Sequence, residues 1–440
     1  MSFITDKQTL DDLNIPGKYR ADSVFSLFNK VFTRGGERLL SDMFQKPLSD
    51  HKQINERSKI FQDFISHSFK FPFIKEQFQV MEEYLSGQGQ GNLFSAGVLV
   101  YWQKIQALAV NDEGYGELHH QLITTLQLLN VFRDFLKTVD NISHNLFIQQ
   151  LQDTSNFLDS ERLRWLDKVR NKKQLTTSEV IRYDHQLRTV LVIEMKALLE
   201  IIYLLDVYIA VSSVARKKKF SVATALPQQS NILQVNNLRH PCLERAIGNA
   251  ISVSADDNVV FLTGANMAGK STFMKSFGIA FYLAHMGFPV AAENMIFSVK
   301  DGLYTSINVP DNLDMGYSHF YAEVLRVKHV AIEITKPLDL LIIFDELFKG
   351  TNVKDAYDAT LSVTEAFAEK RDCFFIISTH ITEAGEELRQ RCDNLQFLYF
   401  PSLLQGNSPV YTYKLEEGIS NDKHGMMIIR KEGILELIEG

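Results

Sequence analysis

Hydrophobic residues recur at every third or fourth position through the first half of the chain, the spacing of helices that bury one face. Residues 186–216 contain neither proline nor glycine, so they could form one helix of about 45 Å at 1.5 Å per residue. The pattern predicts an all-α domain over residues 1–229. A typical apolar stripe runs through Leu122, Leu126, Leu129, Phe132 and Leu136.

The pattern changes near residue 230, after Pro227 and a short polar segment. From there, short runs of β-branched, aromatic and aliphatic residues alternate with helical segments. Strands that alternate with helices form a parallel sheet covered by helices on both faces. The sequence therefore predicts a multidomain protein, in which the all-α domain is followed by an α/β domain over residues 230–440. The clearest strand runs cover residues 259–263, 340–344, 374–378 and 395–400.

Charge distinguishes the two halves. Residues 1–230 carry 28 basic and 26 acidic side chains, whereas the remaining residues carry 18 and 27. An acidic α/β half is a poor surface for nucleic acid, and a formal net charge of -7 argues against a protein that coats it. The single basic run, Arg-Lys-Lys-Lys at residues 216–219, is more typical of a solvated helix end than of a nucleic-acid contact.

Cysteine use and hydropathy indicate a reducing, aqueous environment. The three cysteines have neither C-x-x-C nor metal-ligand spacing, so no disulfide framework or zinc site is expected. The N-terminal residues lack the apolar core of a secretory signal. The most apolar long stretch, residues 197–215, contains Glu200 and Asp206 and therefore resembles a buried helix more than a membrane span. We expect a cytoplasmic protein without a membrane partner.

Residues 264–271 carry the pattern G-x-x-x-x-G-K-S between an apolar strand and a helical segment. Backbone N–H groups of such a loop surround a polyphosphate, and the following helix directs its positive end toward it. Lys270 would neutralise phosphate oxygens, and Ser271 would be a ligand of Mg²⁺. Because the strand and the helix flank the pattern as this chemistry requires, the sequence predicts binding of ATP with Mg²⁺.

Two further strand ends carry candidate catalytic groups. The run 340–344 is followed by Asp345 and Glu346; in P-loop enzymes the first acid helps to hold Mg²⁺, and the second can polarise the attacking water. The run 374–378 leads to His380, which could sense the γ-phosphate or orient the water. The alternative is a pair of solvated acids and a structural histidine. Functional groups gather at the carboxyl ends of parallel strands, so we favour catalytic roles for Glu346, His380 and Lys270.

Residues 263–272 read TGANMAGKST, and other segments with distinctive sequences follow and precede them. Together these segments resemble, in the same order, the motifs of the MutS family of DNA mismatch repair ATPases. The loop is similar to the family's TGPNMGGKST, including its Asn-Met pair. The helical half resembles the start of the family's core or lever region more weakly, at residues 36–40, 46–48 and 54–57. The other similar segments are LRHP at 238–241 (RHP), GYSHF at 316–320 (GRSTF) followed by Glu323, DELFKGTN at 345–352 (DEIGRGTS) and STH at 378–380 (ATH).

The resemblance implies an ABC-like ATPase domain that forms a homodimer with two composite nucleotide sites. Ser318 would reach the partner's γ-phosphate, Asn249 would lie near the nucleotide, and Tyr413 would stack on adenine. The alternative for Tyr413 is a half-buried strand tyrosine. Ser271 and Asp345 would hold the metal. The implied nucleotide-binding residues are Asn249, Gly264, Ala265, Asn266, Met267, Ala268, Gly269, Lys270, Ser271, Thr272, Ser318 and Tyr413.

The same resemblance predicts a short form of the family. Full-length members have a mismatch-reading domain and a connector before the helical core, and here the core-like segment begins near residue 22. No β-rich insertion of the DNA-clamp type is evident within residues 85–220. We therefore expect a helical core or lever domain at 1–229 and an ATPase domain at 230–440.

The leading functional hypothesis is an ATP-driven dimer switch that acts on mismatched or branched DNA, or on a repair complex. Its rival is an ATP-regulated adaptor with little turnover and little DNA contact, which the acidic charge and the missing clamp favour. A P-loop kinase that phosphorylates a small molecule is a third reading, and the Asp-Glu pair suits water activation better.

Overall fold

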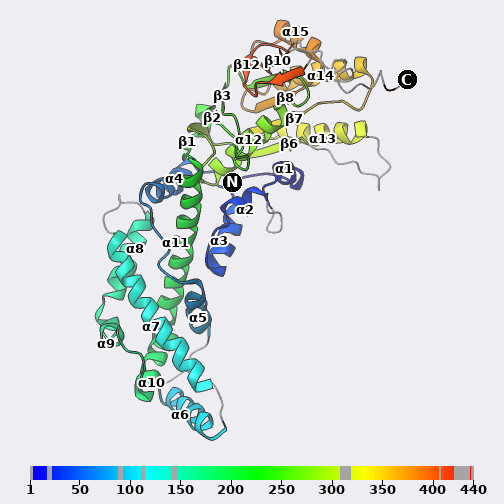
Figure 1. Cartoon of the computed structure of the whole chain (residues 1–440). Coiled ribbons are helices and arrows are strands. Elements are labelled where there is room, and N and C mark those ends of the chain that lie inside the picture. Colours follow the sequence, from blue (N-terminus) through cyan, green and yellow to red (C-terminus); the bar gives the residue numbers. More distant parts are fainter. Residues whose placement is uncertain are drawn as a thin grey trace. The chain divides into compact units, whose positions relative to one another are not determined.

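The computed structural model describes residues 3–16, 22–87, 93–110, 114–139, 146–307, 319–405, 408–420 and 437 (Figure 1). The chain divides into two compact units. We call them the α/β unit (Met1–Phe28, Met43–Phe61 and Val214–Gly440) and the helical unit (Asn29–Asp42 and Gln62–Ser213). Compactness does not show which segments fold independently, so the domain division at 229/230 stays a prediction.

The larger sheet of the α/β unit has the strand order β12-β9-β4-β8-β7-β6, and only β12 is antiparallel to its neighbour. The four strand runs expected from the sequence are confirmed as β4, β7, β8 and β9. Strands β4, β6 and β8 are buried along their whole length, which explains why β4 and β8 appear in the sequence as continuous apolar runs. The strands are β4 (Val259–Gly264), β6 (Gly302–Ser306), β7 (Leu340–Asp345), β8 (Phe374–Ser378), β9 (Leu395–Phe400) and β12 (Glu416–Glu417).

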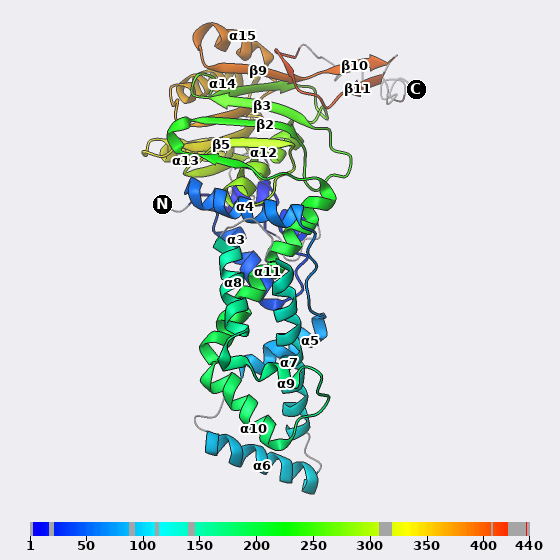
Figure 2. The same cartoon turned by 90° about the vertical axis from the view of Figure 1, so that its left-hand side faces the viewer.

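A smaller sheet has the order β1-β5-β2-β3, and strands β10 and β11 form a separate hairpin (Figure 2). Helix α12 (Lys270–His285) packs against β2 of the smaller sheet and against β4, β6 and β7 of the larger sheet, and most of its residues are buried. The strands are β1 (Thr224–Leu226), β2 (Ile232–Leu238), β3 (Asn249–Ser254), β5 (Asn294–Ser298), β10 (Ser402–Gln405) and β11 (Ser408–Tyr411).

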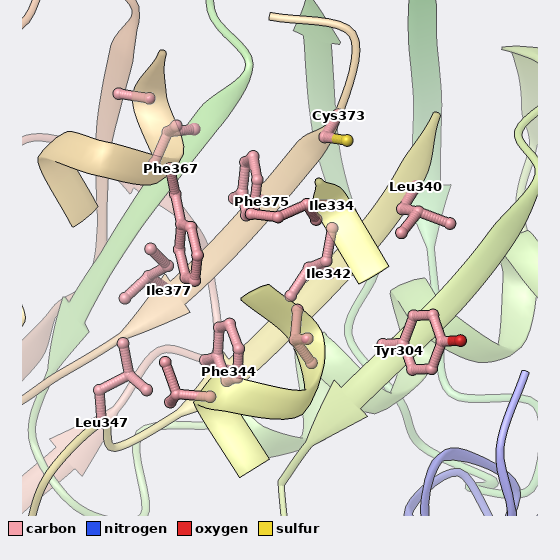
Figure 3. Packing of buried hydrophobic residues seen from close by; sticks show 14 of the residues in the cluster. Tyr304, Ile334, Leu340, Ile342, Phe344, Leu347, Phe367, Cys373, Phe375 and Ile377 are labelled. Atoms are coloured by element: carbon pink, nitrogen blue, oxygen red, sulfur yellow. The ribbon is translucent and has the colours of Figure 1, made fainter. Parts of the chain in front are cut away.

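The opposite face of the larger sheet packs against α13 (His319–Ile334) and α14 (Val353–Ala368), as Figure 3 shows. The ring of Phe367 stacks on Phe344 and on Phe375, with centroids 5.8 and 4.9 Å apart. Ile343, next to Phe344 in the same strand, instead faces Gly278 of α12. This alternation along β7 lets one strand hold helices on both faces of the sheet. Helix α15 (Thr382–Arg391) packs against α14 and β9.

Segments from the start of the chain complete the α/β unit. Helix α1 (Lys7–Asp12) packs against β6, and the Asp12 carboxylate accepts hydrogen bonds from the Thr305 hydroxyl at 2.7 Å and the Ile307 N–H at 2.9 Å. The Tyr282 hydroxyl donates to the carbonyl of Phe44 at 2.5 Å. Helix α2 (Val24–Phe28) and the first part of α4 (His51–Ser66) belong to the same unit.

The helical unit has no strand among its described residues, and none occurs among the described residues of 85–220. The predicted single helix over 186–216 was wrong at its start. Residues 186–190 form a π-helical turn that Leu191 ends, and the long helix α11 begins only at Val192. The other helices are α3 (Arg34–Gln45), α5 (Lys75–Ser86), α6 (Leu93–Val110), α7 (Gly114–Val139), α8 (Leu146–Leu158), α9 (Leu166–Val169) and α10 (Thr177–His185).

Helix α11 (Val192–Lys218) is, among the described residues, the one helix long and apolar enough to cross a membrane, but 67% of its most apolar window is buried inside the protein. Its Asp206 is fully buried and accepts hydrogen bonds from the N–H groups of Phe32 and Thr33, at 2.9 and 2.8 Å, just before α3 begins. The Asp206 carboxylate thus satisfies backbone N–H groups at the start of α3, which explains why this buried apolar helix contains an acidic residue. The basic run at 216–219 lies at its C-terminal end, where positive charge complements the helix dipole.

His285, at the end of α12, makes the stability of the α/β unit sensitive to pH. The ring is fully buried, Nδ1 bonds to the Phe281 carbonyl at 3.0 Å, and Nε2 accepts from the Lys300 N–H at 3.1 Å. Burial lowers the pKa of His285 to about 4. The unfolded chain binds a proton below pH 6.5 and the folded chain does not, so stability falls as the pH drops from 6.5 to 4.

We expect this histidine to remove about 1.4 kcal/mol of stability per pH unit across that window, once its protonation in the unfolded chain is complete. Urea unfolding at pH 6.5, 5.5 and 4.5 measures the loss. His285→Phe keeps a ring between the neighbouring aromatic side chains but cannot titrate, so its stability should fall less steeply with acid. Equal pH dependence in the two proteins would contradict the prediction.

Candidate nucleotide site

The phosphate loop connects β4 to α12 through two glycines with positive φ. Gly264 has φ +138°, and a β-carbon there would lie 3.0 Å from the carbonyl oxygen of Phe400. Gly269 has φ +109° and immediately precedes α12. L side chains rarely adopt this backbone, so both glycines of the motif are required by geometry. The first N–H groups of α12 have no partners within the helix and are directed at the loop.

Lys270 lies across the loop rather than in solvent. Its residue is 4% exposed, and its amine donates to the carbonyls of Gly264 at 2.7 Å and Ala265 at 3.2 Å. Burial lowers the pKa of Lys270, and the charges of Asp345 and Glu346 oppose that shift. A buried ammonium group bonded mainly to neutral carbonyls lacks a full countercharge, which a polyphosphate would supply.

Ser271 and Asp345 form a pair of oxygen ligands at the start of α12 and the end of β7. The Ser271 hydroxyl donates to Asp345 Oδ2 at 2.5 Å. The other carboxylate oxygen, Oδ1, is buried without a normal hydrogen bond among the described residues. Burial raises the pKa of Asp345, and the hydroxyls of Ser271 and Ser378 oppose that shift. A hydroxyl, a carboxylate and an unsatisfied oxygen fit Mg²⁺, which takes few protein ligands and keeps water.

Glu346 and His380 lie at the ends of adjacent strands and contact each other. His380 Nε2 lies 2.7 Å from Glu346 Oε1, and Lys349 Nζ lies 3.4 Å from Oε2. The hydrogen bond with His380 holds the pKa of Glu346 at about 2, against the opposing effect of burial. The backbone of Glu346 has φ +56°, a strained value for a residue with a side chain. The carboxylate is therefore fixed in place as an anion.

A cavity of about 340 Å³ opens beside the loop, which suits a ligand of nucleotide size. Asn249 and Tyr413 line it together with the loop. Asn249 also has a structural role, because its side-chain amide donates to the Tyr413 carbonyl at 3.1 Å and accepts from the Leu415 N–H at 2.8 Å. Tyr413 is not in a strand, because β11 ends at Tyr411, and its half-exposed ring lies against Gly269.

The structure places most of the predicted site residues together. Residues 264–272 form the loop and the start of α12, and Lys270, Ser271 and Glu346 line the cavity. Asp345 bonds to Ser271, and His380 bonds to Glu346. Ser318 lies outside the described residues.

Other residues of the cavity wall were missed by sequence reasoning. Most of them come from the turn between β2 and β3, which has neither helical nor strand periodicity. His240 belongs to the LRHP segment, which was the only signal; burial lowers the pKa of this histidine. Leu243 and Ile247 are 51% and 40% exposed, which is typical of apolar residues at the mouth of a binding site. The missed lining residues are Leu238 at the end of β2, then His240, Leu243, Arg245, Ala246 and Ile247 of the turn, and Phe273, Ser276 and Phe400.

A glycine loop before a helix, a Ser-Asp pair and a mainly parallel sheet are features that this chain shares with P-loop nucleotide-binding proteins. The family model for MutS domain V matches residues 260–438. The chain is 29% identical over 240 residues to the DNA mismatch repair protein MutS of Petrotoga mobilis, covering 53% of this chain and 29% of that protein. It is 30% identical over 237 residues to MutS of Streptococcus equi subsp. equi, covering 52% and 27%.

Over residues 260–438 the chain matches the MutS family, whose domain V is the ATPase domain. Its match to MutS of Lysinibacillus sphaericus is 28% identity over 232 residues, covering 51% of this chain and 26% of that protein. The matched region thus spans less than a third of the length of these curated relatives.

Proposed function

We propose that this chain binds ATP with Mg²⁺ in the cavity beside residues 264–272, hydrolyses it, and uses the cycle to switch a dimer that engages DNA or a repair complex. The observation that carries the proposal is the convergence of five groups at three strand ends. Lys270 and Ser271 follow β4, Asp345 ends β7 with Glu346 after it, and His380 follows β8.

Each of these groups has a role that its contacts support. Lys270 would exchange its two carbonyl partners for phosphate oxygens, gaining a charge-assisted bond. Ser271 and Asp345 would hold Mg²⁺, which when bound neutralises charge on the phosphates. Asn249 and Tyr413, which line the cavity together with the loop, would border the base.

Glu346 would act as the general base for the attacking water. While His380 and Lys349 hold its pKa at about 2, the carboxylate is a weak base. Movement of His380 from Glu346 toward the γ-phosphate would raise the proton affinity of the carboxylate, so that hydrolysis would follow nucleotide binding. In this proposal the domain is ABC-like, Ser318 of a second copy completes the site, and the protein acts in the cytoplasm.

Phosphate release from ATP by the whole chain, measured with Mg²⁺ and with excess EDTA, tests the enzymatic part. Release that depends on Mg²⁺ supports the proposal. ATP binding without release would favour the ATP-regulated adaptor.

DNA binding is the part of the proposal that the charge distribution opposes, and a salt titration tests it. If the chain contacts phosphates, its affinity for branched or mismatched duplexes should fall steeply with salt, by about one order of magnitude in affinity per tenfold salt for each phosphate contact. A double-stranded DNA of the same length without branch or mismatch is the matched control. No binding at low salt, with or without ATP, would contradict a role on DNA.

A further inference from the structure

Helix α6 (Leu93–Val110) of the helical unit carries an apolar stripe on its outer side. The stripe consists of Val98, Tyr101, Trp102 and Ile105, at the i, i+3, i+4, i+7 spacing of one helix face. These side chains are 47%, 51%, 59% and 58% exposed. We call this set the α6 stripe.

The opposite side of α6 packs against the rest of the helical unit, so the exposed stripe is not the side with which α6 is anchored in the fold. Helix α6 packs against α10 and α7, and it lies beside α10 in both views (Figures 1 and 2). Val100 is 2% exposed, and the amine of Lys104 donates to the Thr177 hydroxyl of α10 at 2.8 Å. A β-carbon on Gly97 would contact Ile181. Helix α6 is therefore apolar on a packed side and on an open side, whereas a helix of this composition is normally covered all round.

The composition of α6 indicates what covers the stripe. Lys104 is the only charged residue between Leu93 and Val110, and it is engaged with Thr177. The stripe therefore offers no charge to select an acidic or basic partner, and two identical stripes bring no like charges together. An uncharged, self-complementary patch is what a twofold contact requires. In an antiparallel arrangement of two α6 helices, Trp102 and Ile105 of each copy would lie against the stripe of the other.

The area of the stripe sets the strength of such a contact. Two aromatic and two aliphatic side chains at this exposure present roughly 400 Å² per copy. Pairing two copies would bury about 800 Å² in total, below the roughly 1,200 Å² of the smallest stable interfaces. We therefore expect a weak contact, with a dissociation constant in the micromolar range.

We propose that the α6 stripe is a weak, twofold interface between two copies of this chain, separate from the nucleotide site. The inference does not depend on the proposed ATPase function, because the interface needs neither ATP nor DNA.

Sedimentation equilibrium of the full chain without nucleotide, from about 1 to 100 µM, tests the proposal. We expect a concentration-dependent dimer whose dissociation constant rises at least tenfold in Trp102→Glu, since a central tryptophan is a typical interface anchor. Ile193→Glu is the matched control, because Ile193 is 77% exposed on α11 of the same unit and lies outside the stripe. Circular dichroism confirms that both variants are folded.

A second readout locates the contact. The chain has two tryptophans, so Trp165→Phe leaves Trp102 as the only one. Its emission should shift to shorter wavelength as dimer forms, because the indole leaves water. A wild type that stays monomeric, or a dimer that Trp102→Glu leaves intact, would overturn the proposal. Binding of the monomer to phosphatidylcholine vesicles with the same spectral shift would also overturn it, in favour of a lipid surface. None of these outcomes bears on ATP binding.

Discussion

Glu346→Gln is expected to leave ATP bound and to lower the rate of phosphate release by at least about 100-fold, the smallest effect usual for loss of a general base. Glutamine keeps the size of the side chain and can still hydrogen-bond to His380, which contacts Glu346 at 2.7 Å. It cannot take a proton from water. Single-turnover phosphate release measures the chemical step, and fluorescent ATP binding measures affinity.

Glu386→Gln is the matched control for this substitution. Glu386 is exposed on α15, and its ion pair is with Arg389 on the surface of the same helix. The control should release phosphate at the wild-type rate. If Glu346→Gln also released phosphate at that rate, Glu346 would have no part in the chemistry and the water would need another base.

Lys270→Ala is expected to weaken ATP binding by about 10- to 100-fold, the range for loss of a hydrogen bond to a charged group. The stability of the nucleotide-free protein should fall much less than its ATP affinity. Burial disfavours the charged amine, and the amine bonds to loop carbonyls that water in the cavity can satisfy. The measurements are ATP titration by calorimetry and thermal unfolding with and without ATP. The wild type should gain melting temperature on adding Mg²⁺ and ATP, and the variant should gain much less.

Lys370→Ala separates the loss of this particular amine from a general loss of positive charge. Lys370 is exposed, and its carbonyl bonds to Asn258, which precedes β4 at the end of the sheet away from the loop. Its ATP affinity should be unchanged. An equal loss of affinity in both variants, or none in Lys270→Ala, would remove Lys270 from the phosphate site.

Sequence reasoning located β4, β7, β8 and β9 of the larger sheet, whose continuous apolar runs and flanking turns are visible locally, and it missed β6 and the two-residue β12, which have no such run. The run 340–344 is β7, and 374–378 is β8. The helix predicted over 186–216 was wrong at its start, because the π-helical turn at 186–190 has helix-forming residues and no glycine or proline to mark it. The difference there is one of hydrogen-bond register, which composition does not encode.

The sequence by itself determined the phosphate loop, its two obligatory glycines and the order of the acidic and histidine segments, because each depends on neighbouring residues. Only the tertiary structure decided how these groups meet. It bonded His380 to Glu346, which holds the pKa of that carboxylate at about 2, and left Asp345 with a buried oxygen free of a normal hydrogen bond. It also showed that the turn between β2 and β3 lines the cavity and that Val98, Tyr101, Trp102 and Ile105 of α6 face outward. Such features depend on packing between segments far apart in the chain, and that packing cannot be predicted from the local pattern of residues.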